Sequence, residues 1–255
     1  MEMVPLCDEA IARVLARDDD GAHRSVSLRH ALIHRSPCLW GDHPRRPRSV
    51  VLVREGDGRE GRHAFGLGEA EPAVGWLSRL GRRVSLLAPT AWEWAIRRRG
   101  SAVLRGIVET WVRPPGDDPP THADPPIARR LGPFDEPAFL VAAPSWALQG
   151  WGSFGGLIRE GAAFGVPDRD GRLLALAWTF EADDGRDALA VATVPRYRRL
   201  GLGRAAGAAL LEHVEAERLK VPIWTVADEN VASKALARSL GFSPRAREVV
   251  LRWEP

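Results

Sequence analysis

The stretch from Asp187 to Gly207 constrains the fold most, because an apolar run, a basic turn with two glycines and an alanine-rich segment follow one another there. Pro195 cannot donate to a strand ladder, so the apolar run of residues 188–194 is expected to end as a strand before it. The small residues after the turn favour a helix that packs closely on a sheet. The sequence therefore predicts a strand, a loop and a helix N-terminus in succession.

This turn is suited to bind an anion. Gly201 and Gly203 lack a Cβ atom, so the backbone can take positive φ and point several N–H groups at one ligand. The helix that opens near Leu202 adds its unpaired first-turn donors and the positive end of its dipole. Arginines 198, 199 and 204 add full charges. A glycine turn that only joins a strand to a helix is the alternative interpretation.

Two motifs carry a resemblance to a known family. The spacing Arg-x-x-Gly-x-Gly, filled by Arg198, Gly201 and Gly203, resembles the acyl-CoA-binding motif of the GNAT superfamily of N-acyltransferases. Residues 230–242, which begin with Asn and end in Leu-Gly-Phe, resemble a later pattern of the same family. Neither a G-x-G-x-x-G dinucleotide fingerprint nor a Walker loop is present. The resemblance covers about residues 127–253.

The resemblance implies an α/β (α+β) fold with a mixed, mostly antiparallel sheet, whose fourth and fifth strands splay to admit pantetheine. It implies acetyl-CoA or another acyl-CoA as the cofactor. The main chain of residues 191–194 would then contact pantetheine, the loop would hold the pyrophosphate, and two residues of the second motif would face the cofactor. The implied cofactor-binding residues are Val191, Ala192, Thr193, Val194, Arg198, Arg199, Leu200, Gly201, Leu202, Gly203, Arg204, Asn230 and Ser233.

The chemistry implied is direct attack of an acceptor amine on the acyl thioester. An ammonium must first lose a proton, so a carboxylate or a water chain is needed nearby. Asp187 falls at the start of the fourth strand, where the family often carries an acidic base, and Glu181 is the second candidate. Both could equally be solvated turn residues. A main-chain N–H near Thr193 or Val194 would stabilise the oxyanion.

One position departs from the family pattern. Many members carry a tyrosine in the helix before Leu-Gly-Phe that protonates the leaving thiolate, whereas this chain has Ala237 there. Tyr197, the only tyrosine, lies in the loop and is not placed for that task. Ser233, Ser239 or water would have to supply the proton, unless no acid is needed for a thiolate whose conjugate acid has a pKa near ~8.5.

The acceptor side is marked only by two tryptophans. In the family, the acceptor usually docks between the first and second strands, which makes Trp146 and Trp151 candidate substrate-binding residues; covering the sheet is an equal alternative. The sequence predicts an N-acetyltransferase that acts on a small-molecule or peptide amine. A non-catalytic acyl-CoA-binding or regulatory module, or a transferase acting on a protein-borne or RNA-borne amine, remains an alternative.

The chain is predicted to have two domains. Residues 114–126 contain six prolines in thirteen positions, which predicts an extended linker between a smaller α/β accessory domain at 1–113 and the GNAT domain at 127–255. Residues 66–68, Gly-Leu-Gly, precede a helix as Gly201–Gly203 do, which suggests a degenerate GNAT-like half. Glu69 and Glu71 stand where phosphates would need positive charge, so a second acyl-CoA site is not expected.

Bulk properties exclude little. The net charge of +3 comes mainly from arginine, and the clusters at residues 45–48 and 97–99 could touch nucleic acid, but no such partner is expected. His30 and His34 have a chelating i, i+4 spacing. Their neighbours His23, Cys38 and His43 are irregularly spaced, so no metal is expected. No apolar run reaches the ~18 residues of a membrane span. Together with two cysteines and no signal pattern, this predicts a cytoplasmic protein.

Overall fold

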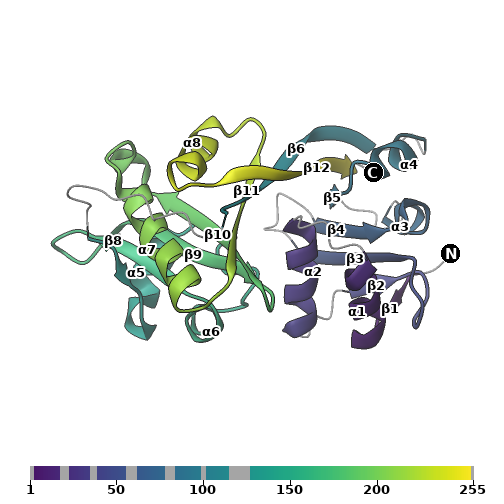
Figure 1. The fold of residues 1–255 in the computed structure, drawn as a ribbon, viewed down its shortest axis with the longest axis horizontal. Coiled ribbons are helices and arrows are strands. Elements are labelled where there is room, and N and C mark those ends of the chain that lie inside the picture. The colour runs from purple at the N-terminus through teal and green to yellow at the C-terminus, as the bar shows by residue number, and fades with distance from the viewer. Residues whose placement is uncertain are drawn as a thin grey trace. The chain divides into compact units, whose positions relative to one another are not determined.

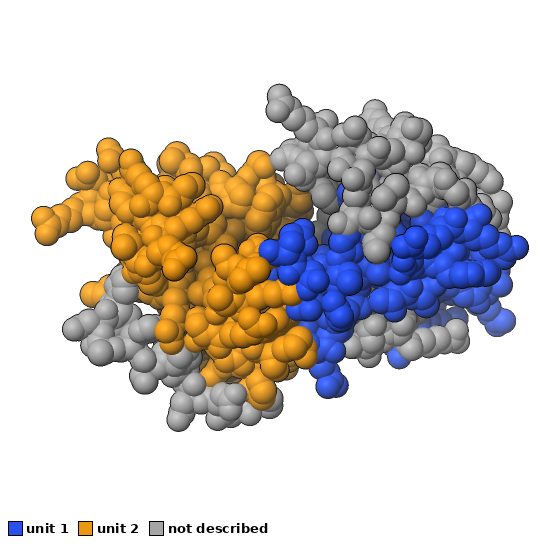
Figure 2. Space-filling model, turned by 90° about the horizontal axis from the view of Figure 1, so that it is seen from above, with its two compact units in different colours: residues 1–110, 226–229, 245–255 blue, residues 111–225, 230–244 orange. Residues whose placement is uncertain are grey.

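The computed structural model describes residues 3–17, 23–34, 39–55, 62–77, 84–98, 102–114 and 127–253, so the predicted linker lies almost wholly outside the described residues. The chain forms two compact units. Unit 1 contains Met1–Thr110, Val226–Glu229 and Arg245–Pro255, and unit 2 contains Trp111–Thr225 and Asn230–Pro244. Figure 2 colours the residues of each unit. The C-terminal segments of unit 1 differ from the predicted division, which assigned everything after residue 126 to the second domain.

Unit 1 combines helices and strands (Figure 1). Its elements are β1 (Val4–Pro5), α1 (Asp8–Arg17), α2 (His23–Ile33), β2 (Leu39–Gly41), β3 (Ser49–Glu55), β4 (Arg62–Gly68), α3 (Ala70–Leu77), β5 (Val84–Ala88), α4 (Trp92–Arg98), most of β6 (Ala102–Val112) and most of β12 (Ser243–Trp253).

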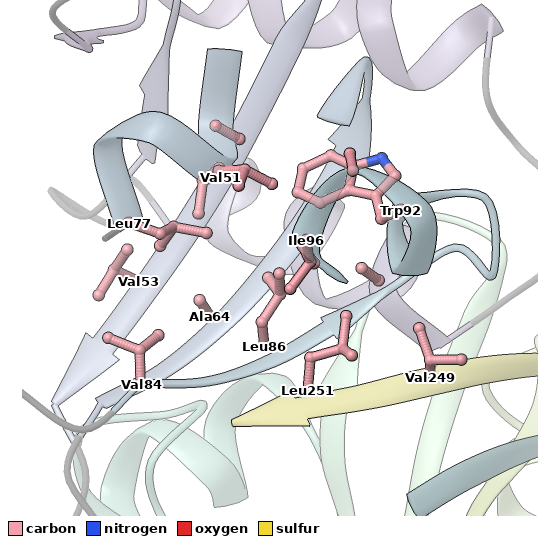
Figure 3. Close-up of a cluster of buried hydrophobic side chains, with 14 of the residues drawn as sticks. Val51, Val53, Ala64, Leu77, Val84, Leu86, Trp92, Ile96, Val249 and Leu251 are labelled. Atoms are coloured by element: carbon pink, nitrogen blue, oxygen red, sulfur yellow. The ribbon is translucent and has the colours of Figure 1, made fainter. Parts of the chain in front are cut away.

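The strands of unit 1 follow the order β1-β2-β3-β4-β5-β12-β6. From β1 to β12, neighbouring strands are antiparallel except β4 and β5, which are parallel. Along β3, Val51 and Val53 pack with α3 and α4, whereas Val50 and Leu52 pack with α2. This period of two is what a sheet covered on both faces requires. Figure 3 shows the core on the α3–α4 side, to which β12 contributes from the far end of the chain.

Unit 2 carries the stretch that the sequence singled out. Its elements are β7 (Arg129–Arg130), the 3₁₀ helix η1 (Pro133–Asp135), α5 (Glu136–Ala142), α6 (Phe154–Glu160), β8 (Ala163–Pro167), β9 (Leu173–Ala182), β10 (Arg186–Thr193), the 3₁₀ helix η2 (Pro195–Tyr197), α7 (Leu202–Ala216), most of β11 (Val221–Ala227) and α8 (Val231–Ser239).

The sheet of unit 2 has the order β7-β8-β9-β10-β11, antiparallel except for the parallel pair β10 and β11. Val191 and Thr193 point at α7, whose Gly203 lies against both of them. Ala190 and Ala192 instead pack with the core that α5 and α6 complete. Helix α7 therefore covers one face of this sheet and α5 with α6 the other (Figure 1). The predicted mixed, mostly antiparallel α/β sheet is confirmed.

Candidate functional site

The basic turn between β10 and α7 is open at its tip. Gly201 caps α7 with φ +78°, and a Cβ atom there would meet nothing within 4 Å. Arg199, just before it, also has positive φ, at 67°, a conformation that costs a non-glycine residue about 1 kcal/mol or more. The N–H groups at the start of α7 thus face an uncrowded space, as an anion site at a helix N-terminus requires.

A second glycine of the turn serves packing. A Cβ atom at Gly203 would lie 2.7 Å from Thr193 Oγ1, so only glycine lets the first turn of α7 approach the end of β10 this closely. One helical turn further, a Cβ at Gly207 would lie 3.0 Å from Leu240 Cδ1. The small residues of α7 therefore fix the N-terminus of this helix directly beside the end of β10.

Arginines surround the same place. Arg198 and Arg199 are exposed, and the Nε of Arg198 makes only a long hydrogen bond, 3.4 Å, to the Thr193 carbonyl. Arg204, in the first turn of α7, is half-buried, and within the described residues its buried Nε has no hydrogen-bond partner. A buried guanidinium nitrogen left without an acceptor is costly unless a ligand supplies one. The three predicted arginines are therefore gathered around the helix N-terminus.

The strand before the turn separates from its neighbour. The parallel pairing of β10 and β11 runs from Arg186↔Val221 to Leu189↔Trp224 and stops there, although β10 continues to Thr193. Residues 190–194 are half-buried. The main chain of the predicted residues Val191, Ala192, Thr193 and Val194 thus lies past the point where the two strands part, which is the expected splay.

The two candidate bases lie on opposite faces of the sheet. Asp187 is fully buried and accepts hydrogen bonds from Arg218, one of them 3.1 Å long, while Lys220 lies 3.4 Å from the same carboxylate. Glu181 is also fully buried, and a register shift pairs it with Ala188 on the face of α5 and α6. Neither residue is a solvated turn residue, and the role of each as a base stays a prediction.

The two candidate acceptor residues differ in exposure. Trp146 is 39% exposed, with its ring 5.5 Å from that of Trp178 and 5.4 Å from that of Phe180. Trp151 is half-buried and donates its Nε1–H to the Thr179 carbonyl over 2.7 Å, which ties the segment before α6 to β9. Trp146 is therefore available to a ligand, whereas Trp151 holds the sheet cover in place. Phe180 was not predicted from the sequence, because its position follows from the register shift between β9 and β10.

The residues of the second motif form α8 and its N-cap, and one of them bonds to β11. Asn230 is the N-cap, since its side chain accepts the Ser233 N–H at 3.0 Å, and the Ser233 hydroxyl accepts the Trp224 Nε1–H at 3.0 Å. Ala237 is fully buried, and the Ser239 hydroxyl donates to the Leu236 carbonyl at 2.8 Å. The Ser239 proton is thus engaged within α8, and a role of Ser233 or water as the acid stays a prediction.

The Leu-Gly-Phe end of the motif forms a helix C-cap. Gly241 has φ +85°, Phe242 N–H bonds to the Ala237 carbonyl, and Gly241 N–H bonds to the Arg238 carbonyl. This is the Schellman arrangement, which requires a left-handed residue after the C-cap. The motif therefore ends α8 sharply and brings the buried Phe242 ring next to Trp224 in β11, with centroids 5.6 Å apart.

Comparison with known proteins decides the family of this part of the chain. The sequence model of the GNAT acetyltransferase family matches residues 145–247, which include the basic turn, the splayed strand and α8. Residues 145–247 form a GNAT acetyltransferase domain. An uncharacterized N-acetyltransferase from the mutA 5′ region of Streptomyces virginiae is 35% identical over 101 residues, which are 39% of this chain and 43% of that protein. The chain thus matches less than half the length of this relative.

Solved structures extend the likeness beyond the GNAT domain. A GCN5-related N-acetyltransferase-like protein from Streptococcus suis has a TM-score of 0.68 at 17% identity, over 96% of this chain and 99% of its own. A tandem GNAT protein from the clavulanic acid biosynthesis pathway has a TM-score of 0.64 at 16% identity, over 98% of this chain and 97% of its own. At such identities the likeness concerns the fold, and it includes unit 1 as well as the GNAT domain. The expected GNAT-like fold of the N-terminal half is confirmed.

Other expectations concerned metals and membranes. Among the residues that the structure describes, which do not include Cys38, no three His, Cys, Asp or Glu side chains gather to hold a metal ion, and the His30 and His34 rings pack at 4.3 Å. Helices long and apolar enough to cross a membrane are absent from the described segments.

Proposed function

We propose that the GNAT domain binds acyl-CoA at the turn before α7 and transfers the acyl group to a primary amine of a small molecule or peptide. Acetyl is the acyl group that we propose. The observation that carries the proposal is the open helix N-terminus at Gly201 with the partnerless Nε of Arg204 beside it. Phosphate oxygens are the acceptors that such a nitrogen and such N–H groups need. The family match and the name of the Streptomyces relative support acetyl transfer.

The half-buried end of β10 supports the remainder of the cofactor site. Residues 190–194 lie past the last pair with β11, so their N–H and C=O groups are those that an extended amide chain such as pantetheine can bond. A pantetheine arm on this strand would lead from the pyrophosphate turn toward Leu189. The thioester would then lie near the middle of the sheet, between the faces on which Asp187 and Glu181 lie.

At the acyl carbon, the reaction forms one bond and breaks another, and two proton transfers accompany this exchange. The amine nitrogen bonds to the acyl carbon, the carbon–sulfur bond breaks, a base takes the proton that the amine loses, and the thiolate takes a proton from Ser233 or water. A main-chain N–H near Thr193 or Val194 would hold the oxyanion. Glu181 is the better base candidate, since it lies on the face that carries Trp146, whereas Asp187 lies on the other face.

The test combines binding and turnover. Titration calorimetry with acetyl-CoA measures cofactor binding, and release of free CoA in the presence of small amines, a peptide and a basic protein measures transfer. Binding together with amine-dependent CoA release is the expected result. Binding without release for every acceptor would favour a non-catalytic acyl-CoA module, and release only with the basic protein would favour a macromolecular acceptor. Absence of binding would overturn the proposal.

Two variants separate the candidate bases. Glu181→Gln is expected to lower kcat by about 10²–10⁴-fold while the Kd for acetyl-CoA changes little, because general base catalysis contributes roughly that factor. Asp187→Asn is expected to lower thermal stability first. If Glu181→Gln leaves the pH profile of kcat unchanged, the base is elsewhere.

A further inference from the structure

The two units repeat one succession of elements. In unit 1, three antiparallel pairings lead to β4, and α3, the parallel strand β5 and α4 follow. In unit 2, three antiparallel pairings lead to β10, and α7, the parallel strand β11 and α8 follow. The parallel pair stops early in both units, after Phe65↔Leu87 in one and Leu189↔Trp224 in the other. Unit 1 therefore contains the same splay as the proposed cofactor site.

In unit 1 the splay is filled by a side chain. Trp92 is 1% exposed, and a Cβ atom at Gly66 would lie 2.5 Å from its Cη2 and Cζ3 atoms, so the indole lies directly on the β4 backbone. Its Nε1 donates to the Gly68 carbonyl over 2.7 Å. Figure 3 shows the ring within the buried core that includes Ile96 and Val249. The indole thus combines apolar contact with a hydrogen bond to the strand end.

The helix that follows the splay in unit 2 begins with a small and exposed side chain instead of an indole. Trp92 is the first residue of α4, and the first residue of α8 is Val231, which is 72% exposed. Residues 190–194 of β10 are half-buried, whereas Gly66 and Leu67 of β4 are buried. The same splay is therefore covered in unit 1 and accessible in unit 2.

The turn before the helix is closed in unit 1 as well. Only Glu69 separates β4 from α3, whereas residues 194–201 separate β10 from α7. Gly68 has φ +80°, but a Cβ atom there would lie 2.1 Å from the Arg48 carbonyl oxygen, which also accepts the Glu69 N–H at 2.8 Å. Backbone of the chain itself occupies the space that is open at Gly201, so no phosphate can enter.

We propose that Trp92 is an internal substitute for the pantetheine arm: its indole fills the splay of unit 1, so each chain binds acyl-CoA in unit 2 alone and unit 1 keeps a latent slot for a flat aromatic ligand. The stoichiometric part of this inference rests on the proposed function, because it takes the splay of unit 2 to be the cofactor site. The slot itself follows from the contacts of Trp92.

The first experiment is the stoichiometry of acetyl-CoA binding to the full chain by titration calorimetry. One cofactor per chain is expected, and two per chain would overturn the inference. If no acetyl-CoA binds, the proposed function fails, and the second experiment still decides whether unit 1 contains the slot.

The second experiment compares Trp92→Ala with Trp94→Ala, a matched control because Trp94 lies in the same helix and is 65% exposed. Trp92→Ala is expected to lower the Tm by about 10 °C, since removing a buried tryptophan leaves a cavity. Millimolar indole is expected to restore several degrees to Trp92→Ala and nothing to Trp94→Ala, because dry apolar cavities bind aromatic molecules of matching size. An equal response of both variants to indole would overturn the inference that Trp92 fills a slot.

If Trp92→Ala does not fold in buffer, refolding yield replaces the Tm as the measurement. A yield that rises with indole for Trp92→Ala, and not for Trp94→Ala, supports the slot, whereas an unchanged yield overturns it. Trp92→Phe keeps a ring and loses the N–H donor to Gly68. It is expected to fold with a smaller fall in Tm and with little response to indole.

Discussion

Units 1 and 2 build the same sequence of strands and helices, yet only unit 2 leaves its central splay accessible. The two units differ in two short segments. The connection from the splayed strand to the next helix is one residue long in unit 1 and eight residues long in unit 2. The helix after that begins with the buried Trp92 in unit 1 and with the exposed Val231 in unit 2. The comparison teaches that this fold can close the space beside a splayed strand, because backbone of the chain and one indole occupy it in unit 1.

The largest expected effect tests whether a buried charge pair stabilises unit 2. Asp187→Asn removes the charge that pairs with Arg218 and Lys220 at a fully buried position. Breaking such a pair leaves uncompensated charge and costs about 3–5 kcal/mol, so thermal unfolding should begin roughly 10 °C lower. Asp170→Asn, in an exposed turn, is the control and should change little. A Tm for Asp187→Asn equal to that of the control would contradict the assignment.

The next effect tests whether unit 1 depends on packing from the end of the chain. Leu251 of β12 is 1% exposed in the core that α3 and α4 cover. Leu251→Ala should lower the free energy of unfolding by about 2–5 kcal/mol. Hydrogen exchange should accelerate in β5, which pairs with β12. Val231→Ala, at an exposed position, serves as control, and unchanged exchange in β5 would show that β12 is dispensable.

A third test concerns the close approach of α7 to β10. Gly203→Ala would place a Cβ atom 2.7 Å from Thr193 Oγ1 and push the helix N-terminus away from the strand end. The Kd for acetyl-CoA should rise about 100-fold, because a misplaced helix end loses several N–H bonds to phosphate. Gly185→Ala is the control: its added Cβ atom would meet no atom within 4 Å, so this variant should bind acetyl-CoA with unchanged Kd. Equal Kd values for both variants would contradict the proposal that this turn binds the cofactor.

A smaller effect is expected from one charge of the turn. Arg204→Gln keeps a polar side chain but removes the guanidinium whose Nε has no partner among the described residues. The Kd for acetyl-CoA should rise about tenfold, as for a lost charge-assisted hydrogen bond. The difference should shrink in high salt. Arg169→Gln, in an exposed turn of unit 2, is the matched control, and a loss of affinity there of the same size would indicate general charge attraction instead.

The smallest effect concerns pH. The hydrogen bonds from Arg129 lower the pKa of the Asp135 carboxyl, which also accepts the Gly132 N–H at 2.8 Å ahead of α5. A lowered folded-state pKa gives stability that is present above the unfolded value of ~3.9 and is lost as the pH falls through the folded pKa. Asp135→Asn should therefore lower the Tm by about 2 °C at pH 7 and by progressively less as the pH falls below the unfolded value. A constant difference across this range would exclude the ion pair as its source.

The sequence was a good guide to the order of elements in unit 2. The strand predicted for residues 188–194 is present as β10, and the glycine turn precedes a helix that starts at Leu202. These features follow from local rules: proline ends a strand, glycine permits positive φ, and a hydrophobic period fixes the element type. The family motif added the splay, which local rules alone do not give.

Predictions that depended on partners distant in sequence were less accurate. A solvated turn was one interpretation of Asp187, yet it is fully buried because Arg218 and Lys220, about thirty residues later, neutralise it. For Trp151 the substrate contact stays a prediction, whereas its hydrogen bond to the Thr179 carbonyl of β9 was not predicted. A side chain's partner across a sheet depends on strand order and register, and residue spacing along the chain does not report either one.

Sequence alone determined the strand, the glycine turn and the arginine-rich helix start, because backbone freedom and charge are properties of the residues themselves. Only the tertiary structure decided which copy of the splay stays open. Gly66-Leu67-Gly68 and Gly201-Leu202-Gly203 read alike in sequence, but the Arg48 carbonyl and the Trp92 indole occupy the space beside the first, while the space at Gly201 is empty. The physical reason is close packing: what fills a gap between two strands comes from elsewhere in the chain.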